Sequence, residues 1–206
     1  TTNSKYIPIV SGLLETFWKF HPEIKMCVLC VNLKETEKQH LNNLHSNLIL
    51  IEDNHKFPNE HVERNYCAHN RTWFMPALMK KYKCNIFWLD ADVQLKGKID
   101  PLFDLMKDVD FMIRAKTMQP FTCNCGMVWT KYSEKNNDIL FEGAQEAKNL
   151  DVLNYWYADQ KSLNKIIQKY YNELSLIDYR TFPEEYDGRQ NNEKSIIIHH
   201  KGPKFI

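Results

Sequence analysis

The stretch that most restricts what this chain can fold into is NIFWLDADVQL, residues 85 to 95. Residues 86–89 are all apolar, so a strand here presents apolar side chains to both faces, as in a sheet covered by helices on both sides. Helical and strand patterns alternate along the first half of the chain, which is typical of parallel strands joined by helices. We therefore predict an α/β fold with a mainly parallel central sheet flanked by helices.

The expected helices repeat their apolar residues every three or four positions, and the expected strands are short apolar runs. Pro76 predicts a kink or a break within the third helical pattern, because proline lacks a backbone N–H. Helices are expected at residues 7–20, 35–45, 60–82, 138–150 and 158–171. Strands are expected at residues 25–32, 47–53, 85–90, 109–115, 126–132, 174–179 and 195–200.

Length, charge and hydropathy restrict the class of protein. The 206 residues contain no linker-like segment and no repeat, so a single domain over residues 1–206 is expected. The formal net charge of +1, without a long basic block, argues against a nucleic-acid binder. No run reaches the roughly 18 apolar residues of a membrane helix, and the first residues lack a signal-peptide pattern. We expect a cytoplasmic protein with no transmembrane segment.

The six cysteines raise the alternative of a structural zinc site, because Cys27 and Cys30 form a C-x-x-C pair and Cys123 and Cys125 a C-x-C pair. However, Cys27 and Cys30 lie in an expected strand, where positions three apart point to opposite faces. Buried free cysteines in a reducing compartment are the favoured interpretation.

Asp90 and Asp92 follow the apolar run 86–89, and strand alternation places both on one side with Ala91 pointing away. Two carboxylates this close remain ionised when a cation or hydrogen-bond donors compensate their charge. Carboxylate oxygens suit Mn²⁺ or Mg²⁺, and such ions commonly also bind substrate phosphates. In open α/β sheets ligands bind at the carboxyl ends of the strands, where this pair is expected.

Five stretches in the same order resemble GT-A fold glycosyltransferases with an Asp-x-Asp motif, of the glycogenin-like and lipopolysaccharide-galactosyltransferase-like kinds. Small sugar transferases of this type are encoded by large DNA viruses and bacteria. Together the stretches extend from Thr1 to Lys204. They are TTNSKYIPIVSGLLETFWKFHPEIKMCVLCVN, FWLDADVQL with the following GKIDPLFDL, CNCGMVWT, YADQKSLN and HHKGPKF.

The resemblance implies a GT-A, Rossmann-like fold, with a nucleotide-binding half at about residues 1–92 and a donor-sugar and acceptor half at about 93–206. It implies an enzyme that uses Mn²⁺ or Mg²⁺ to transfer a sugar from a UDP-sugar, such as a UDP-glucose-like donor, to a glycan or glycoprotein hydroxyl. The HHKGPKF segment slightly favours retention of the anomeric configuration over inversion.

The resemblance also implies metal and diphosphate contacts. Asp90 would contact the ribose and the metal, Asp92 would bridge the metal to the diphosphate, and His199 would be the third ligand, with His200 as the competing candidate. Ala91 belongs to the same donor-binding segment. Lys201 and Lys204 would meet the diphosphate, and Gly202 would allow the backbone to approach it. The family's longer H-x-x-G-x-x-K-P-W pattern is not complete here, because the lysine comes one residue early and Pro-Trp is missing.

Further residues are implied around the nucleotide and the sugar. Thr2, Asn3 and Tyr6 would hold the uracil and ribose. The strand that precedes this turn in the family is missing or very short here, so either the N-terminus of the protein lies upstream of Thr1 or the sheet lacks a full first strand. Arg71 would lie against phosphate, with Arg64 and Lys80 as rivals. Asn124 and Gly126 would contact the donor sugar, and Asp159 and Gln160 would be the catalytic residues beside the anomeric carbon. Asp159 would act as the base if the reaction inverts, or support the cationic sugar if it retains.

Two alternatives remain open. A nucleotidyltransferase that makes sugar nucleotides would share the α/β plan and the acidic ligands, but it usually carries a glycine-rich phosphate loop, and this chain has only six glycines and no such loop. A catalytically inactive, carbohydrate-binding module of the same fold would be expected to have lost the aspartate pair or the C-terminal histidine, and both are present.

Overall fold

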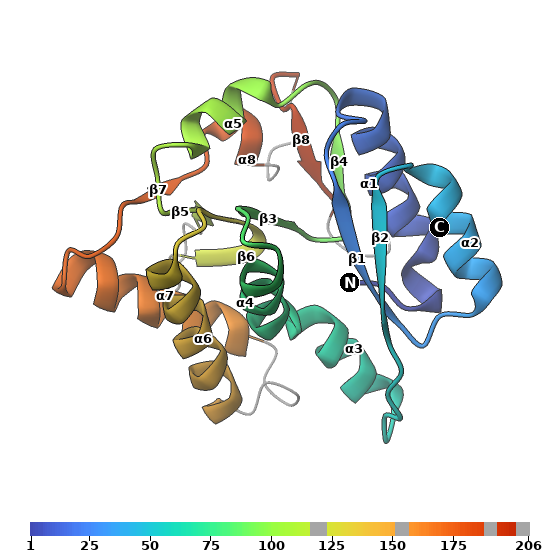
Figure 1. Cartoon of the computed structure of the whole chain (residues 1–206), viewed down its shortest axis with the longest axis horizontal. Coiled ribbons are helices and arrows are strands. Elements are labelled where there is room, and N and C mark those ends of the chain that lie inside the picture. Colours follow the sequence, from blue (N-terminus) through green and yellow to red (C-terminus); the bar gives the residue numbers. More distant parts are fainter. Residues whose placement is uncertain (116–122, 151–156, 188–192, 201–206) are drawn as a thin grey trace. The chain divides into compact units, whose positions relative to one another are not determined.

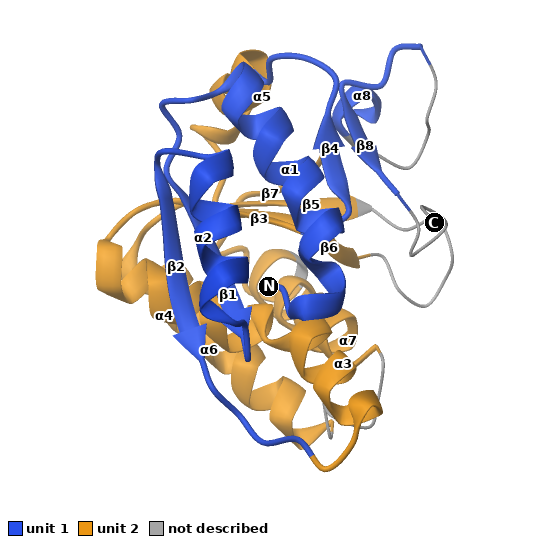
Figure 2. Cartoon of the chain, turned by 90° about the vertical axis from the view of Figure 1, so that its right-hand side faces the viewer, with its two compact units in different colours: residues 1–57, 90–99, 183–206 blue, residues 58–89, 100–182 orange. Residues whose placement is uncertain are grey.

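The structure is a computed structural model that describes residues 1–115, 123–150, 157–187 and 193–200 (Figure 1). The chain divides into two compact units, each made of segments that are distant in sequence (Figure 2). Unit 1 comprises residues 1–57, 90–99 and 183–206, and unit 2 comprises residues 58–89 and 100–182. The single domain over residues 1–206 with two functional halves stays a prediction.

Unit 1 contains two small pairs of strands. β1 and β2 are parallel, and Thr2 forms a parallel bridge with Cys30 of β1. β4 and β8 form a separate antiparallel pair. The described elements of this unit are η1 (Ser4–Tyr6), α1 (Ile7–Phe20), β1 (Met26–Val31), α2 (Glu35–Leu44), β2 (Leu48–Asp53), β4 (Val93–Leu95), α8 (Glu184–Asp187) and β8 (Ile197–His199).

The core of unit 1 forms where α1 and α2 pack against β1. Leu14 of α1 and Leu41 of α2 are fully buried, in one cluster with Val28 of β1. α1 also holds the segment that contains β4, because the Leu95 N–H donates to Thr16 Oγ1 (3.2 Å) and the Ile99 N–H donates to the buried His21 just after α1 (2.9 Å). The β4 segment is thus fixed to α1 by hydrogen bonds as well as by packing.

Unit 2 is built on a four-stranded sheet in the order β3-β6-β5-β7. Its described elements are α3 (Glu60–His69), α4 (Arg71–Tyr82), β3 (Ile86–Leu89), α5 (Asp100–Met106), β5 (Phe111–Ala115), β6 (Cys123–Thr130), α6 (Glu134–Asn149), α7 (Ala158–Ile167), the π-helix η2 (Gln168–Glu173) and β7 (Tyr179–Thr181). Met79, Phe111 and Ile113 are fully buried in its core, which α4, α6 and α7 share with the sheet.

The prediction of a mainly parallel sheet is wrong for this unit, because β6 runs antiparallel to both β3 and β5, and only β5 and β7 are parallel. Only residues 116–122 separate β5 from β6 in the sequence. Antiparallel neighbours can be joined by so short a connection, whereas parallel neighbours need a crossover of about a dozen residues or more. The α/β class is confirmed, with a mixed sheet. The parallel pairing is confirmed for β1 and β2.

Two local predictions are also corrected. Of the kink or break expected at Pro76, the break does not occur, because α4 continues through Pro76, and the expected helix is instead divided at Asn70, where α3 ends. A kink at Pro76 stays a prediction. Burial of Met75 and Met79 on either side of Pro76 offsets the hydrogen bond that proline cannot donate. The strand expected at residues 174–179 is shifted to β7, because residues 174–176 close the end of η2, where the Leu176 N–H donates to Tyr170 O (2.7 Å).

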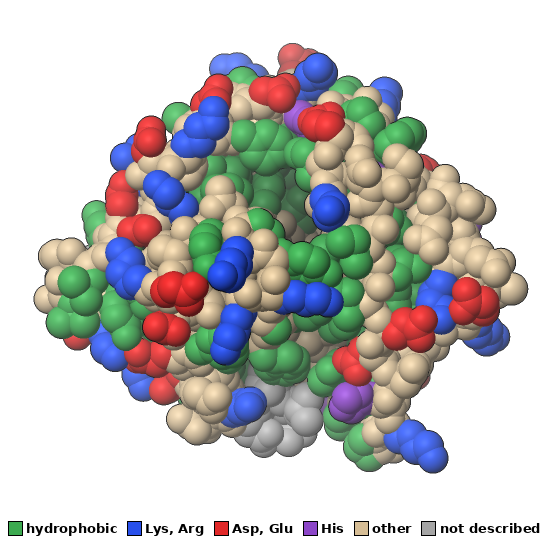
Figure 3. Space-filling view, in the orientation of Figure 1, with side chains coloured by type: hydrophobic (Ala, Val, Ile, Leu, Met, Phe, Trp, Pro, Cys, Tyr) green, Lys and Arg blue, Asp and Glu red, His purple; other side chains and the backbone are tan. Residues whose placement is uncertain are grey.

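The remaining predicted elements agree with the structure to within a few residues. The helix predicted at residues 7–20 matches α1, and the helix predicted at 158–171 divides into α7 and η2. None of the described helices is long and apolar enough to cross a membrane. Basic and acidic side chains are interspersed on the face shown in Figure 3, in keeping with the nearly balanced counts of 27 Lys and Arg and 26 Asp and Glu residues.

Asp110, just before β5, ties three segments of unit 2 together. Its carboxylate accepts hydrogen bonds from Asn136 Nδ2 (2.8 Å) and from the Asp178 N–H (3.0 Å), and Lys135 Nζ lies 3.4 Å away. Burial by itself would raise the pKa of Asp110, but these hydrogen bonds and the lysine charge outweigh it and lower the pKa below its ordinary value.

We expect Asp110 to make the stability of the protein depend on acid pH. Because the pKa is lowered in the folded state, its contribution is present well above the unfolded value of about 4 and is lost as the pH falls through the folded value. In urea unfolding, wild type should lose more stability between pH 5 and pH 3 than Asp110→Asn does. The exposed control Asp104→Asn should follow wild type, and a parallel decline of Asp110→Asn and wild type would contradict this expectation.

Candidate functional site

The two aspartates lie in the turn between β3 and β4. The Val93 N–H donates to Asp90 O (3.1 Å) and closes this turn. Ala91 packs against the apolar cluster of unit 1, so the residue between the two aspartates points into the core. The side chains of Asp90 and Asp92 are 29% and 21% exposed and face the same histidine. The expected arrangement, with both carboxylates on one side, is therefore present, in a turn rather than at a strand end.

The pairing of β4 with β8 brings that histidine to the aspartates. Val93 is the register partner of His199, and the His200 N–H donates to Asp92 O (2.9 Å). His199 Nε2 lies 2.9 Å from Asp92 Oδ1 and 3.7 Å from Asp90 Oδ2. His199 thus meets two aspartates that precede it by more than 100 residues in the sequence, all within unit 1.

The donor set fits a divalent cation. Asp90, Asp92 and His199 form the one group of potential ligands found among the described residues, and their ligand atoms lie within 4.8 Å of one another. No cysteine belongs to this group. Two carboxylates and one imidazole can together hold a divalent cation, and adjacent ligands of such an ion lie about 3 Å apart. His199 and Asp92 already have this separation.

His200 points to different partners from those of His199. Its Nε2 lies 3.1 Å from Gln94 Oε1. Burial lowers the pKa of His200, which more than offsets the opposing effect of the Asp92 charge. Of the two histidines considered from the sequence, His199 is the one that the structure groups with the aspartates.

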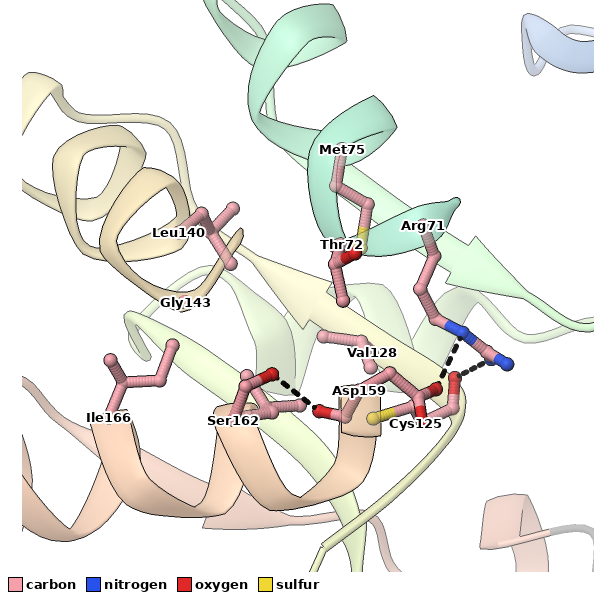
Figure 4. Close-up of a pocket in the computed structure, with 11 residues that line it drawn as sticks. Arg71, Thr72, Met75, Cys125, Val128, Leu140, Gly143, Asp159, Ser162 and Ile166 are labelled. Carbon is pink, nitrogen blue, oxygen red and sulfur yellow. Dashed lines mark hydrogen bonds and ion pairs between the residues drawn. The ribbon is translucent and has the colours of Figure 1, made fainter. Parts of the chain in front are cut away.

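A second group of predicted residues meets in unit 2, around Arg71 at the start of α4. Arg71 Nη1 donates to Cys125 O (2.5 Å), between Asn124 and Gly126 of the CNCG segment. Its Nη2 donates to Ala68 O (2.6 Å), and its Nε lies 3.1 Å from Asp159 Oδ2. Figure 4 shows the guanidinium facing both Asp159 and Cys125. Arg71 therefore joins two motifs of the resemblance, CNCG and ADQ.

Asp159 is held on several sides at the start of α7. Its Oδ1 accepts the Gln160 N–H (2.8 Å), and His69 Nε2 lies 3.7 Å from the same oxygen. The side chain of Asp159 is 2% exposed and that of Arg71 is 11% exposed. A carboxylate in the first turn of a helix is stabilised by the helix dipole, and the guanidinium supplies the counter-charge that its burial requires.

A small pocket with a volume of about 30 Å³ opens beside this ion pair. Its walls are mostly apolar side chains from α4, β6, α6 and α7, including Met75, Val128 and Leu140 (Figure 4). Gly143 brings α6 close to α7 here, because a Cβ at this position would lie 2.5 Å from Ile166 Cδ1. The ion pair thus lies at the polar end of an apolar cavity, where removal of one charge would leave the other poorly solvated.

The residues expected around the uracil and ribose lie in unit 1, at the carboxyl end of β1. The Thr2 N–H donates to Leu29 O, and Thr2 O accepts the Val31 N–H. The side chain of Asn3 accepts the Lys5 N–H (3.2 Å) and caps η1, and Tyr6 precedes α1. Thr2 therefore pairs in parallel with β1, and Asn3 and Tyr6 follow it at the edge where an open α/β sheet binds ligands.

The structure also gives the contacts of the residues expected at the donor sugar and of the two basic residues considered as alternatives to Arg71. Asn124 Oδ1 accepts the Gly126 N–H (3.0 Å) within β6. Arg64 Nη2 lies 3.4 Å from His61 Nδ1 on α3, and the Lys80 ammonium lies over the Phe141 ring. Of the three basic residues considered, Arg71 is the one that contacts Asp159.

Three predicted site residues lie outside the part of the chain that the structure describes, and two residues near the sites were not predicted from the sequence. Lys201, Gly202 and Lys204 lie outside the described residues. The sequence reasoning missed His69 beside Asp159 and Gln94 beside His200. A histidine at a helix end and a glutamine in a three-residue strand carry no local pattern that marks them. Only their tertiary contacts identify them.

We expect Asp159→Asn to destabilise the protein by about 3 kcal/mol, because it leaves the buried Arg71 guanidinium without its counter-charge. Urea unfolding measures this change. The double variant Arg71→Met/Asp159→Leu removes both charges and should cost less than the sum of its two single variants. Equal costs for the double variant and the summed singles would contradict the ion pair.

No protein-family model matches the chain, and no curated protein matches its sequence. The solved structures that are similar to this chain include three glycosyltransferases. They are the glycosyltransferase GlyE of Streptococcus pneumoniae TIGR4 (15% identity, TM-score 0.58, covering 89% of this chain and 44% of that one), a glycosyltransferase involved in glycosylation of the major capsid of PBCV-1 (14%, 0.52, 87% and 94%) and mouse xyloside xylosyltransferase 1 (13%, 0.56, 97% and 93%).

These similarities concern the fold, because sequence identity is 15% or lower. The chain spans less than half the length of the pneumococcal protein and more than nine tenths of the length of the other two. All three are glycosyltransferases by description. The resemblance found in the sequence is therefore confirmed by the tertiary structure: this chain has a glycosyltransferase fold, with an Asp-Asp-His group that can hold a metal ion.

Proposed function

We propose that this protein is a metal-dependent glycosyltransferase that moves a sugar from a UDP-sugar to a hydroxyl group of a glycan or glycoprotein. The observation that carries the proposal is the Asp90–Asp92–His199 group in a chain with a glycosyltransferase fold. Its ligand atoms belong to the residues that the sequence resemblance assigns to the metal.

Asp90, Asp92 and His199 would hold Mn²⁺ or Mg²⁺ together with the donor diphosphate. A bound divalent cation supplies positive charge that makes the diphosphate a better leaving group. Asp92 would orient the diphosphate, and Asp90 would contact the ribose as well. The turn closed by the Val93 N–H keeps these carboxylates in place, so little reorganisation is needed when the donor binds.

The surroundings of Asp159 favour retention over inversion. Its Oδ1 accepts the Gln160 N–H and its Oδ2 lies 3.1 Å from Arg71, while the side chain is 2% exposed. An acceptor hydroxyl therefore has little room to approach this carboxylate as a base must be approached. We propose that Asp159 and Gln160 support the positive charge that develops on the sugar, and that Arg71 holds Asp159 in position. A contact of Arg71 with the diphosphate stays a prediction.

The remaining roles follow the resemblance. Thr2, Asn3 and Tyr6 would hold the uracil and the ribose, and Asn124 and Gly126 would contact the donor sugar. Lys201, Gly202 and Lys204 would meet the diphosphate. Because Arg71 binds the carbonyl of the residue between Asn124 and Gly126, it would also fix the segment that faces the sugar.

We expect Asp92→Asn to lower the Mn²⁺-dependent hydrolysis of a UDP-sugar by about 100-fold or more, since a lost metal ligand removes several kcal/mol of leaving-group stabilisation. The measurement is UDP release in a screen of UDP-glucose, UDP-galactose, UDP-xylose and UDP-N-acetylglucosamine. Asp108→Asn, which alters an exposed carboxylate, is the matched control and should behave as wild type. Near-wild-type turnover of Asp92→Asn in excess Mn²⁺ would refute the metal role.

A thermal-shift experiment separates this function from the two alternatives. UDP with Mn²⁺ should raise the unfolding temperature more than a nucleoside triphosphate with Mn²⁺, because binding to the folded state stabilises it. A larger shift with the triphosphate would favour a nucleotidyltransferase. UDP binding without turnover of any donor would favour an inactive module of the same fold, and no shift with either ligand would reject the transferase.

A further inference from the structure

Gln94 is the central residue of β4, and its side chain extends to two partners within unit 1. Its Oε1 lies 3.1 Å from His200 Nε2. Its Nε2 occupies the space beside Gly12 of α1, where a Cβ on residue 12 would lie only 2.3 Å from that nitrogen. The amide of Gln94 thus lies between helix α1 and the end of β8, and the missing side chain at Gly12 makes room for it.

His200 is joined to the candidate metal ligands through its backbone. It directly follows His199, and its N–H donates to Asp92 O (2.9 Å). Besides the pairing of β4 with β8, the segment that carries His199 is therefore held by the backbone of His200 at Asp92 and by the ring of His200 at Gln94. A carboxamide oxygen accepts hydrogen bonds and does not donate them, so the Nε2 of His200 is the donor in this pair.

We propose that Gly12 and Gln94 position the metal ligands, because the Gln94 amide, seated against Gly12, holds His200 and so fixes His199 beside Asp90 and Asp92. This inference extends the proposed function and rests on its metal site. Groups that orient metal ligands without touching the ion commonly affect metal affinity strongly. Gln94 contacts His200, the neighbour of the ligand His199, and not the ligand itself. We therefore expect a moderate effect on metal affinity.

Gly12→Ala tests the idea without removing any polar group. The atom that the new methyl would meet is the far end of a flexible side chain, so the Gln94 amide is displaced while the helix is preserved. Alanine is also a better helix former than glycine. We therefore expect an unfolding temperature equal to or above that of wild type, together with a Kd for Mn²⁺ that is raised about three- to tenfold. If Gly12 had a purely structural role, the substitution would lower both the affinity for Mn²⁺ and the unfolding temperature.

Gln94→Ala completes a double-mutant cycle. Gln94→Ala should raise the Kd for Mn²⁺ to a similar extent, because His200 loses its acceptor. In Gly12→Ala/Gln94→Ala the methyl meets no amide, so its Kd should equal that of Gln94→Ala alone. The matched controls are Gly97→Ala, whose Cβ would have its nearest neighbour at 3.8 Å, and Gln39→Ala on the exposed face of α2, and both should bind Mn²⁺ as wild type does.

The readout is the free Mn²⁺ signal in electron paramagnetic resonance during titration of the protein, with no donor or acceptor present. If wild type binds Mn²⁺ and folded Gly12→Ala and Gln94→Ala bind it equally well, this inference is overturned and the proposed metal site stands. Additive effects in the double variant would also overturn it, since the glycine would then act by another route. If wild type binds no Mn²⁺, both the metal site and this inference are wrong.

Discussion

The antiparallel pairing of β4 and β8 is the interaction on which the candidate metal centre depends. It joins two strands of only three residues each and sets His199 opposite Val93, one residue after Asp92. Strands this short contribute few hydrogen bonds, so their register has to be held from outside the pair. α1 provides that support, through Thr16 and His21 to the β4 segment and through the space at Gly12 for the side chain of Gln94.

In unit 2, an ion pair that is largely shielded from water brings distant segments together, as the β4–β8 pairing does in unit 1. Arg71 and Asp159 come from different helices. Asp159 is almost fully buried and the side chain of Arg71 is 11% exposed, and each supplies the counter-charge that the other needs. The same guanidinium binds the carbonyl of Cys125, so one side chain links α4, β6 and α7. In the proposed enzyme this pair would hold the sugar-side residues still, whereas the Asp-Asp-His group would provide charge for the diphosphate.

The sequence predicted the local elements of this protein well and their partners less well. α1 and β1 were predicted because their apolar periodicity is a property of neighbouring residues. The predicted mainly parallel sheet was wrong for unit 2, because strand direction depends on the length and path of connections that a periodic pattern does not encode. A break at Pro76 does not occur, because burial of the neighbouring Met75 and Met79 outweighs a local preference.

The sequence by itself determined the α/β class, the aspartate pair after an apolar strand and the series of motifs that resembles a glycosyltransferase. Only the tertiary structure decided that His199, and not His200, joins the aspartates, and that Arg71 meets Asp159. It also decided that Gln94 matters, through a space left by a glycine in a distant helix. The physical reason is that residue types and short spacings set chemistry and local conformation, whereas packing and strand register determine which distant side chains meet.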